Sequence, residues 1–185
     1  MDAHELLKTR RTIRKFDQKP VSRETIRELV DLARYAPSGG NRQDWKIVAV
    51  DDPDRRDQVF DTLAWLPQTG APGEGERPTA YLVIISDQQD AVADCASLAT
   101  YSALAAHSLG LASCWFGSIR RTELAEDLNI PDEFSIEFVL ALGYPAETAE
   151  TVDASEDTTV SVADGVIQIP KLEVDSILHH NTFGG

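Results

Sequence analysis

The spacing of apolar residues predicts several helices along the chain. Residues 25–35 place apolar side chains at the i, i+3, i+4 and i+7 positions of an amphipathic helix: Ile26, Leu29, Val30 and Ala33. Ser22 precedes this run and can cap its start. Shorter helices are predicted over 2–10, 54–63, 121–128 and 172–178. Residues 90–109 are apolar and small almost all round, which is typical of a central buried helix, and Gly110 is expected as its C′ residue.

Continuous apolar runs predict strands between these helices, over 45–50, 80–86, 111–116, 135–142 and 166–169. The Gly/Pro-rich segment 66–78 is interpreted as a mobile lid or a binding loop, because long loops in compact domains usually have a function. The acidic segment 146–164 contains no basic residue and is predicted to follow an irregular path over the surface. Strands and helices that alternate in this way predict an α+β or α/β sandwich, a small sheet surrounded by helices.

Composition and charge narrow the possible functions. A chain of 185 residues fits a single domain, residues 1–185, with a real hydrophobic core. The net charge of −14 argues against non-specific binding to nucleic acid and to anionic membrane surfaces. Because no run approaches a membrane span and the first residues resemble no signal peptide, we expect a cytoplasmic protein. The acidity is compatible with a saline cytoplasm, and equally with an ordinary one.

Against this acidity, the first 27 residues carry eight basic and four acidic side chains. Each guanidinium group can bind two phosphate oxygens at once, so binding of a phosphate monoester would explain this cluster of positive charge. The alternative interpretation is a solvated basic turn. Cys95 and Cys114 lack the spacing of a metal site and are expected to be buried apolar residues. The four histidines show no paired partner by spacing, and His107 is expected to be a core residue. We therefore predict no metal site.

Four blocks of sequence, in order, resemble those of the nitroreductase family, whose members are FMN-dependent reductases. The blocks are RRTIRKF at 10–16, APSGGNRQDW at 36–45, LGLASCWFG at 109–117 and LALGYP at 140–145. The resemblance implies an α+β nitroreductase-like sandwich with a small mixed or antiparallel sheet and a central buried helix. It departs from the family pattern at Asp44, which replaces the usual Pro and suggests a changed loop or an exposed acid at the mouth of the site.

The resemblance also assigns residues to each part of FMN. Arg10 would bind the phosphate, with donors from the Arg11 backbone and the Thr12 hydroxyl. Arg14 would reach the N1–C2=O edge of the ring, where a cation stabilises the reduced flavin, and a surface ion pair is its alternative. Lys171 is a late basic residue that could reach the phosphate or could simply lie on the surface.

The second and third blocks would hold the flavin ring. Pro37 and Ser38 would lie against the ring and its ribityl side, and Gly39 would let the backbone approach closely. Asn41 matches ribityl hydroxyls or the polar ring edge, and Gln43 does the same or only braces the loop. In the third block, Gly117 would donate its N–H to flavin N5, while Phe116 stands where relatives often carry an acid. Trp45 is expected to pack in the core beside the site.

The activity that this resemblance implies is hydride transfer from NADH or NADPH, through flavin N5, to an electron-poor acceptor by a ping-pong cycle. Because the flavin carries the chemistry, no catalytic side chain is assigned. The resemblance also implies a homodimer with FMN at the subunit interface, Arg10 and Arg14 acting from one subunit and residues such as Gln68 or Arg77 from the other. A specialised relative that dehalogenates or fragments flavin, or a non-catalytic FMN-binding or storage protein, remains an alternative.

Overall fold

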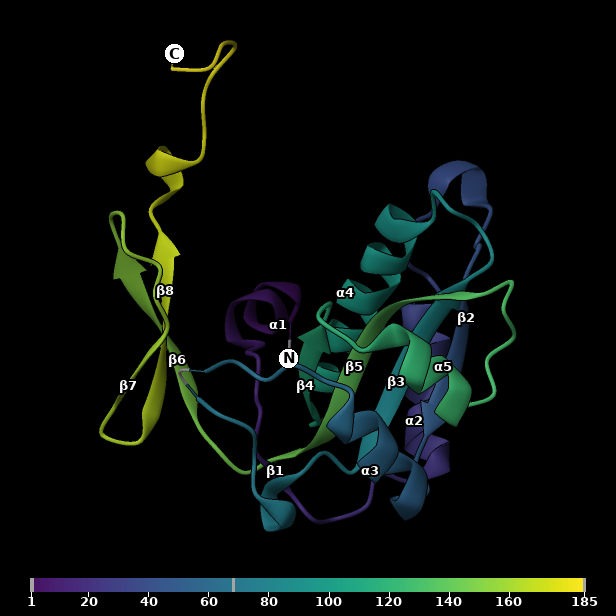
Figure 1. The fold of residues 1–185 in the computed structure, drawn as a ribbon. Coiled ribbons are helices and arrows are strands. Elements are labelled where there is room, and N and C mark those ends of the chain that lie inside the picture. Colours follow the sequence, from purple (N-terminus) through teal and green to yellow (C-terminus); the bar gives the residue numbers. More distant parts are fainter. Residues whose placement is uncertain (1, 68, 185) are drawn as a thin grey trace. The chain divides into compact units, whose positions relative to one another are not determined.

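The structure, a computed structural model, describes residues 2–67 and 69–184. By its internal contacts the chain divides into two compact units, Met1–Ala146 and Glu147–Gly185. Each unit has its own sheet (Figure 1). The expectation that residues 1–185 act as one domain stays a prediction.

The first unit is built on an antiparallel five-stranded sheet. Its longest strand, β5 (Ser135–Pro145), pairs with β3 (Ala80–Ser86) along one edge. Along its other edge β5 pairs first with β4 (Ala112–Phe116) and then with the two-residue strand β1 (Phe16–Asp17). The sheet ends at β2 (Lys46–Val50), which pairs with β3. The predicted strands of this unit are therefore confirmed, and β5 runs three residues beyond its expected end.

The helices of the first unit begin and end within two residues of the predictions. They are α1 (Ala3–Thr9), α2 (Arg23–Ala33), α3 (Pro53–Asp61), α4 (Val92–Ser108) and α5 (Arg121–Asp127), with 3-10 turns η1 (Gly39–Asn41) and η2 (Glu74–Glu76). Local signals explain this agreement: the Ser22 hydroxyl accepts the Thr25 N–H at the start of α2, as expected of an N-cap. Among the helices of the described residues, none has the length and apolar character needed to cross a membrane.

Alternation along the strands divides the helices between the two faces of the sheet (Figure 1). Ala80, Leu82 and Ile84 of β3 pack in two core clusters with side chains of α2 and α4. The intervening Tyr81 points to the opposite face, where it lines a small cavity with Phe60 of α3. Helices α3 and α5 contact each other and lie against β3 and β5. The result is the expected sandwich, with helices on both faces of the sheet.

Helix α4 is central but is buried along one face only. That face consists of small and apolar side chains: Cys95, Leu98, Ala99, Ser102, Ala103, Ala105 and Ala106. Its other side exposes Val92 (48%) and Tyr101 (39%). Gly110 follows the helix with φ of +76°, which confirms the predicted C′ residue. The predicted central buried helix is therefore present, with one face packed in the core of the single chain.

Two other core predictions hold. Cys95 and Cys114 are both buried. Trp45 is half-buried and packs against the core cluster that contains Cys95 and Leu98.

The second unit corrects two predictions. Within 146–164, expected to be irregular, lie β6 (Ala149–Ala154) and β7 (Ser161–Ala163), which flank β8 (Val166–Leu172) in a three-stranded sheet. The acidic residues of β6, Glu150 and Asp153, are exposed while Ile167 of β8 is buried, so the charge of the segment does not prevent pairing. The helix predicted over 172–178 is wrong: β8 extends to Leu172 beside β6, and only the 3-10 turn η3 (Val174–Ser176) follows.

Candidate functional site

The basic N-terminal segment lies along the beginning of β4. Helix α1 ends at Thr9, and the extended chain that follows forms a parallel bridge between Thr12 and Ser113. The Ile13 N–H donates to the Ser113 carbonyl at 3.0 Å. These backbone contacts fix the position of Arg10 and Thr12 relative to β4 and α4.

Arg10 and Thr12 line a cavity of about 230 Å³. The other lining residues come from α1, α4 and β4: Leu7, Thr100, Ala103, Leu104, Ser113 and Trp115. The Arg10 guanidinium and the hydroxyls of Thr12 and Ser113 can thus serve as donors beside apolar walls, whereas the Thr100 hydroxyl donates to the Ala96 carbonyl at 2.9 Å. Such a set of donors suits an anion that carries several oxygen atoms.

The electrostatics of this cavity favour an anion. Burial lowers the pKa of Arg10, and the neighbouring Arg11 lowers it further. Burial also lowers the pKa of Arg11, whose Nη1 donates to the Arg10 carbonyl at 2.8 Å. Two half-buried guanidinium groups repel each other, so a bound anion would relieve this repulsion as well as bond to them.

His107 joins α4 to the end of α1, beside the arginines. Its Nε2 lies 2.8 Å from the Thr9 hydroxyl. His107 therefore has the polar partner expected of a core histidine, but it is half-buried rather than fully buried. Burial lowers the pKa of His107; Arg10 and Arg11 lower it further, and Glu5 opposes the shift. Protonation would place a third positive charge beside the two arginines.

This pKa shift predicts a loss of stability in acid. Because an unfolded histidine titrates near pH 6.5, the unfolded chain takes up this proton before the folded chain does. The contribution of neutral His107 to the free energy of unfolding is therefore full above about pH 6.5 and falls as the pH decreases toward its folded pKa. Urea denaturation between pH 7.5 and 5 should show a shallower decline for His107→Gln than for the parent chain, whereas His180→Gln, at an exposed histidine, should match the parent. A decline unchanged by His107→Gln would contradict this account.

A second group of predicted site residues lies in the loop before β2. The Gln43 N–H donates to the Ser38 hydroxyl at 3.1 Å, and Gln43 Nε2 donates to Asn41 Oδ1 at 3.2 Å. Gly40, Asn41 and Gln43 have φ of +58°, +57° and +55°. The glycine with left-handed backbone is thus Gly40, while a Cβ on Gly39 would make only ordinary contacts, with Asp94 at 3.7 Å and Arg42 at 3.8 Å. The exposed Pro37 begins the loop.

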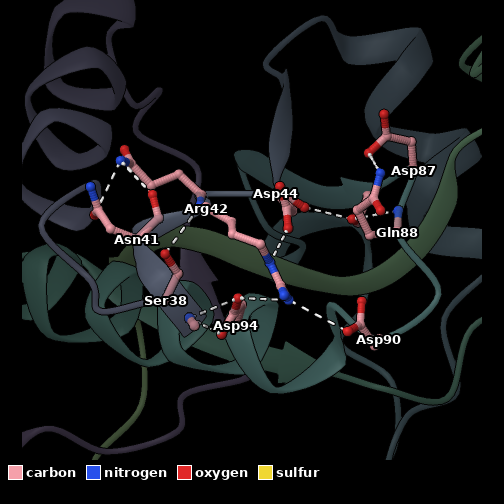
Figure 2. A network of polar contacts seen from close by, with 11 residues as sticks. Ser38, Asn41, Arg42, Asp44, Asp87, Gln88, Asp90 and Asp94 are labelled. Carbon is pink, nitrogen blue, oxygen red and sulfur yellow. Dashed lines mark hydrogen bonds and ion pairs between the residues drawn. The ribbon is translucent and has the colours of Figure 1, made fainter.

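Arg42, which the sequence did not single out, ties this loop to α4 (Figure 2). Its Nε lies 2.7 Å from the Asp44 carboxylate, and its Nη2 lies 3.5 Å and 4.0 Å from those of Asp90 and Asp94. The Gly39 N–H donates to both Asp94 oxygens, at 3.0 and 3.1 Å. Asp44 is therefore an acid paired within the loop, its side chain 22% exposed.

The end of β4 shows how strand alternation distributes its side chains. Phe116 is buried in an aromatic cluster, with its ring centroid 4.8 Å from that of Trp65, which in turn contacts Phe60. Trp115 points to the other face, where it lines the Arg10 cavity. The period of two could have revealed from sequence that Trp115, rather than Phe116, shares a face with Ser113. A role for Phe116 in binding would fall to its backbone, next to the exposed Gly117.

The remaining predicted residues are more scattered. Arg14 is half-buried on the extended segment that leads to β1. Lys171 is exposed on β8 of the second unit, so its role stays a prediction. Arg77 pairs with Asp57 at 2.9 Å, whereas Gln68 lies outside the described residues. Within the described residues, no group of three or more His, Cys, Asp or Glu side chains is placed to hold a metal ion.

Comparison with known proteins identifies the family. The model of the nitroreductase family matches residues 7–83 and 81–144. The chain belongs to the nitroreductase family. A protein of Methanothermobacter thermautotrophicus, whose name couples NADH dehydrogenase with NAD(P)H nitroreductase, is 31% identical over 83% of this chain and 82% of its own. A 5,6-dimethylbenzimidazole synthase of Rhodospirillum rubrum is 28% identical over 77% and 81%.

The fold of the nitroreductase family is also confirmed by a solved structure. The FMN-dependent nitroreductase from Clostridium difficile R20291 superposes with a TM-score of 0.74, at 25% identity, over 97% of this chain and 99% of that one. The family match covers the four sequence blocks that predicted it except for Pro145, the last residue of the fourth, and it includes the Arg10 segment and the loop before β2.

Proposed function

We propose that this nitroreductase-family protein is an FMN-dependent oxidoreductase that transfers hydride from NADH or NADPH to an electron-poor acceptor such as a nitroaromatic, quinone or enone. The observation that carries the proposal is the Arg10 cavity, whose lining offers one guanidinium and the hydroxyls of Thr12 and Ser113 to a phosphate monoester. The names of the relatives agree with it, since they couple NAD(P)H and FMN with reduction.

The residues of the chain fit the separate parts of FMN. Arg10 and the hydroxyls of Thr12 and Ser113 would bind the phosphate, and Arg11 adds positive charge nearby. Asn41 and Gln43 present amide groups for the polar edge of the ring or the ribityl hydroxyls. Arg14 would stabilise negative charge on the ring, and Gly117 would donate to N5.

Bound FMN would supply the hydride chemistry, in two half-reactions that share one stacking surface. The chain would then bind and orient: its basic groups hold the phosphate, and its amide groups fix the ring edge. No side chain is needed to carry the hydride, and protons can come from solvent.

We also propose a homodimer with FMN at the interface. Leu7 (65% exposed), Tyr101 (39%) and Trp115 (39%) come from α1, α4 and β4, and α4 contacts each of the other two elements. Leu7 and Trp115 also line the Arg10 cavity, so the apolar surface continues into the proposed phosphate site. A second copy that covers this surface would remove its apolar side chains from water and enclose the cofactor.

The visible spectrum of the purified full chain tests the proposal, first alone and then under anaerobic NADH or NADPH. Flavin bands that bleach with either nucleotide, in a particle with the mass of a dimer by light scattering, are the expected result. Bands that persist would favour an FMN-storage protein or a specialised relative. A protein that is colourless and takes up no added FMN would refute the proposal.

Flavin fragmentation is a second candidate function. 5,6-Dimethylbenzimidazole contains a dimethyl-substituted benzene ring like that of flavin, and a relative named for its synthesis matches this chain. Loss of the flavin bands without recovery on reoxidation in air would favour this candidate over the reductase, whose bands should return.

A further inference from the structure

The loop that carries Asn41 and Gln43 has a strained backbone. Gly40, Asn41 and Gln43 all have φ near +55° to +60°, and two of the three carry a side chain. L-residues with a side chain adopt this conformation at a cost in free energy, so the surrounding structure must hold it. Burial does not, because residues 39–43 are all exposed. Polar contacts must therefore hold the shape of this loop.

Two sets of contacts anchor the loop to the scaffold, one at each end (Figure 2). At its start, both oxygens of Asp94 accept the Gly39 N–H, and this carboxylate is only 15% exposed in the first turn of α4. A carboxylate is favoured there by the partial positive charge of the helix N-terminus. At its end, the Asp44 carbonyl accepts the hydroxyl of Ser86, the last residue of β3.

Arg42 connects these two anchors. Its guanidinium reaches Asp44 with Nε at 2.7 Å, and turns Nη2 toward Asp90 at 3.5 Å and Asp94 at 4.0 Å. It is the cation that these three ion pairs share, and the hydrogen bond to Asp44 and the charge of Asp90 raise the pKa of Arg42. Without it, three carboxylates would face one another across the loop, a repulsion that favours opening.

We propose that Arg42 is a positioning residue for flavin: it holds Asn41 and Gln43 in the geometry in which they bind the cofactor, and it does so through ion pairs that salt weakens. The inference rests on the proposed function for the identity of the ligand, but the ordering of the loop by Arg42 does not depend on it. Because the Arg42 and Asp90 side chains are 49% and 76% exposed, molar salt screens their attraction.

Amide hydrogen exchange in the full chain, measured with and without FMN, tests the ordering directly. In Arg42→Gln the amides of Gly39 and Gln43 should exchange about tenfold faster than in the parent, because their acceptors Asp94 and Ser38 are no longer held against them. Arg34→Gln is the matched control, since Arg34 pairs with Asp31 at 2.7 Å on α2 and should leave these amides unchanged. Unchanged exchange in Arg42→Gln would overturn the proposal whether or not the protein binds flavin.

Titration with FMN then tests the link to the cofactor. We expect Arg42→Gln to raise the Kd for FMN about tenfold at low salt and to remove most of the dependence of the parent's Kd on salt. Arg42→Lys keeps the charge but not the planar fork, so it should recover only part of the affinity. The midpoint potential of bound flavin should also shift in Arg42→Gln, a change that a general loss of stability would not produce.

The Asp90→Asn variant separates the effect of the ion pairs from a folding defect in Arg42→Gln, because it weakens one exposed ion pair and leaves Arg42 in place. It should raise the Kd for FMN about twofold and leave the melting temperature unchanged. Faster exchange in Arg42→Gln with an unaltered Kd and potential would show that Arg42 orders the loop but does not position flavin, and would also overturn the proposal. A parent chain that binds no FMN would refute the proposed function and this role for Arg42, leaving only the ordering that exchange measures.

Discussion

Replacing Arg10 with glutamine is expected to weaken FMN binding about 100-fold. The guanidinium lines the 230 Å³ cavity together with the hydroxyls of Thr12 and Ser113, which cannot by themselves balance the charge of a phosphate. A hydrogen bond to a charged group contributes about 1.5–3 kcal/mol, and every 1.4 kcal/mol changes a Kd tenfold. Fluorescence titration of the full chain with FMN measures the loss.

Riboflavin, which lacks the phosphate, separates this effect from a general disturbance of the site. Its affinity should be nearly the same in Arg10→Gln and in the parent. Lys8→Gln removes the same charge from an exposed position on α1, two residues away, and should change the Kd for FMN by less than about threefold. Equal losses for FMN and riboflavin in Arg10→Gln would show that Arg10 does not bind the phosphate.

Replacing Gly143 with alanine is expected to destabilise the first unit by about 3 kcal/mol. A Cβ at this position of β5 would lie 2.8 Å from Cδ1 and 3.0 Å from Cβ of Phe16. Phe16 is fully buried on β1, and the close approach of its Cβ means that rotation of the ring cannot relieve the clash. Added volume in a packed core typically costs 1–3 kcal/mol, and a melting temperature about 6–12 °C lower should result.

Gly73→Ala is the control for the added methyl group. Its Cβ would meet open space, and the backbone of Gly73 is not left-handed, so the melting temperature should stay within about 1 °C of the parent. A Gly143→Ala chain with the melting temperature of the parent would mean that β1 and β5 can separate without cost.

Much of the first unit could be predicted from sequence because its signals are local. The Ser22 cap and Gly110 mark helix ends by contacts made within a few residues, and the unbroken apolar run at 80–86 can only be a buried strand or helix core. Wherever pairing partners are distant the prediction was poorer. Strands β6 and β8 are paired in parallel, although β7 lies between them in the sequence. Neither the acidity of 146–164 nor the short apolar run after it indicates that pairing.

The candidate site shows the same division. Motifs placed Arg10 beside Thr12, and Ser38 beside Asn41 and Gln43, because in each case the chain itself keeps these residues together. The contact of Asp94 with Gly39 joins residues 55 positions apart, and that of Ser113 with Thr12 brings β4 to the basic segment; both depend on how α4 and β4 pack.

The family, the order of helices and strands in the first unit and the candidate residues for flavin could all be read from the amino-acid sequence. Those properties follow from local spacing and from motifs that the chain keeps contiguous. The packing of the elements settled three further points: that Ser113 and Trp115 meet Arg10 at one cavity, that Asp44 pairs with Arg42, and that α4 leaves one side exposed. Each of these depends on which elements pack together, because burial and ion pairing are properties of neighbours in space rather than in sequence.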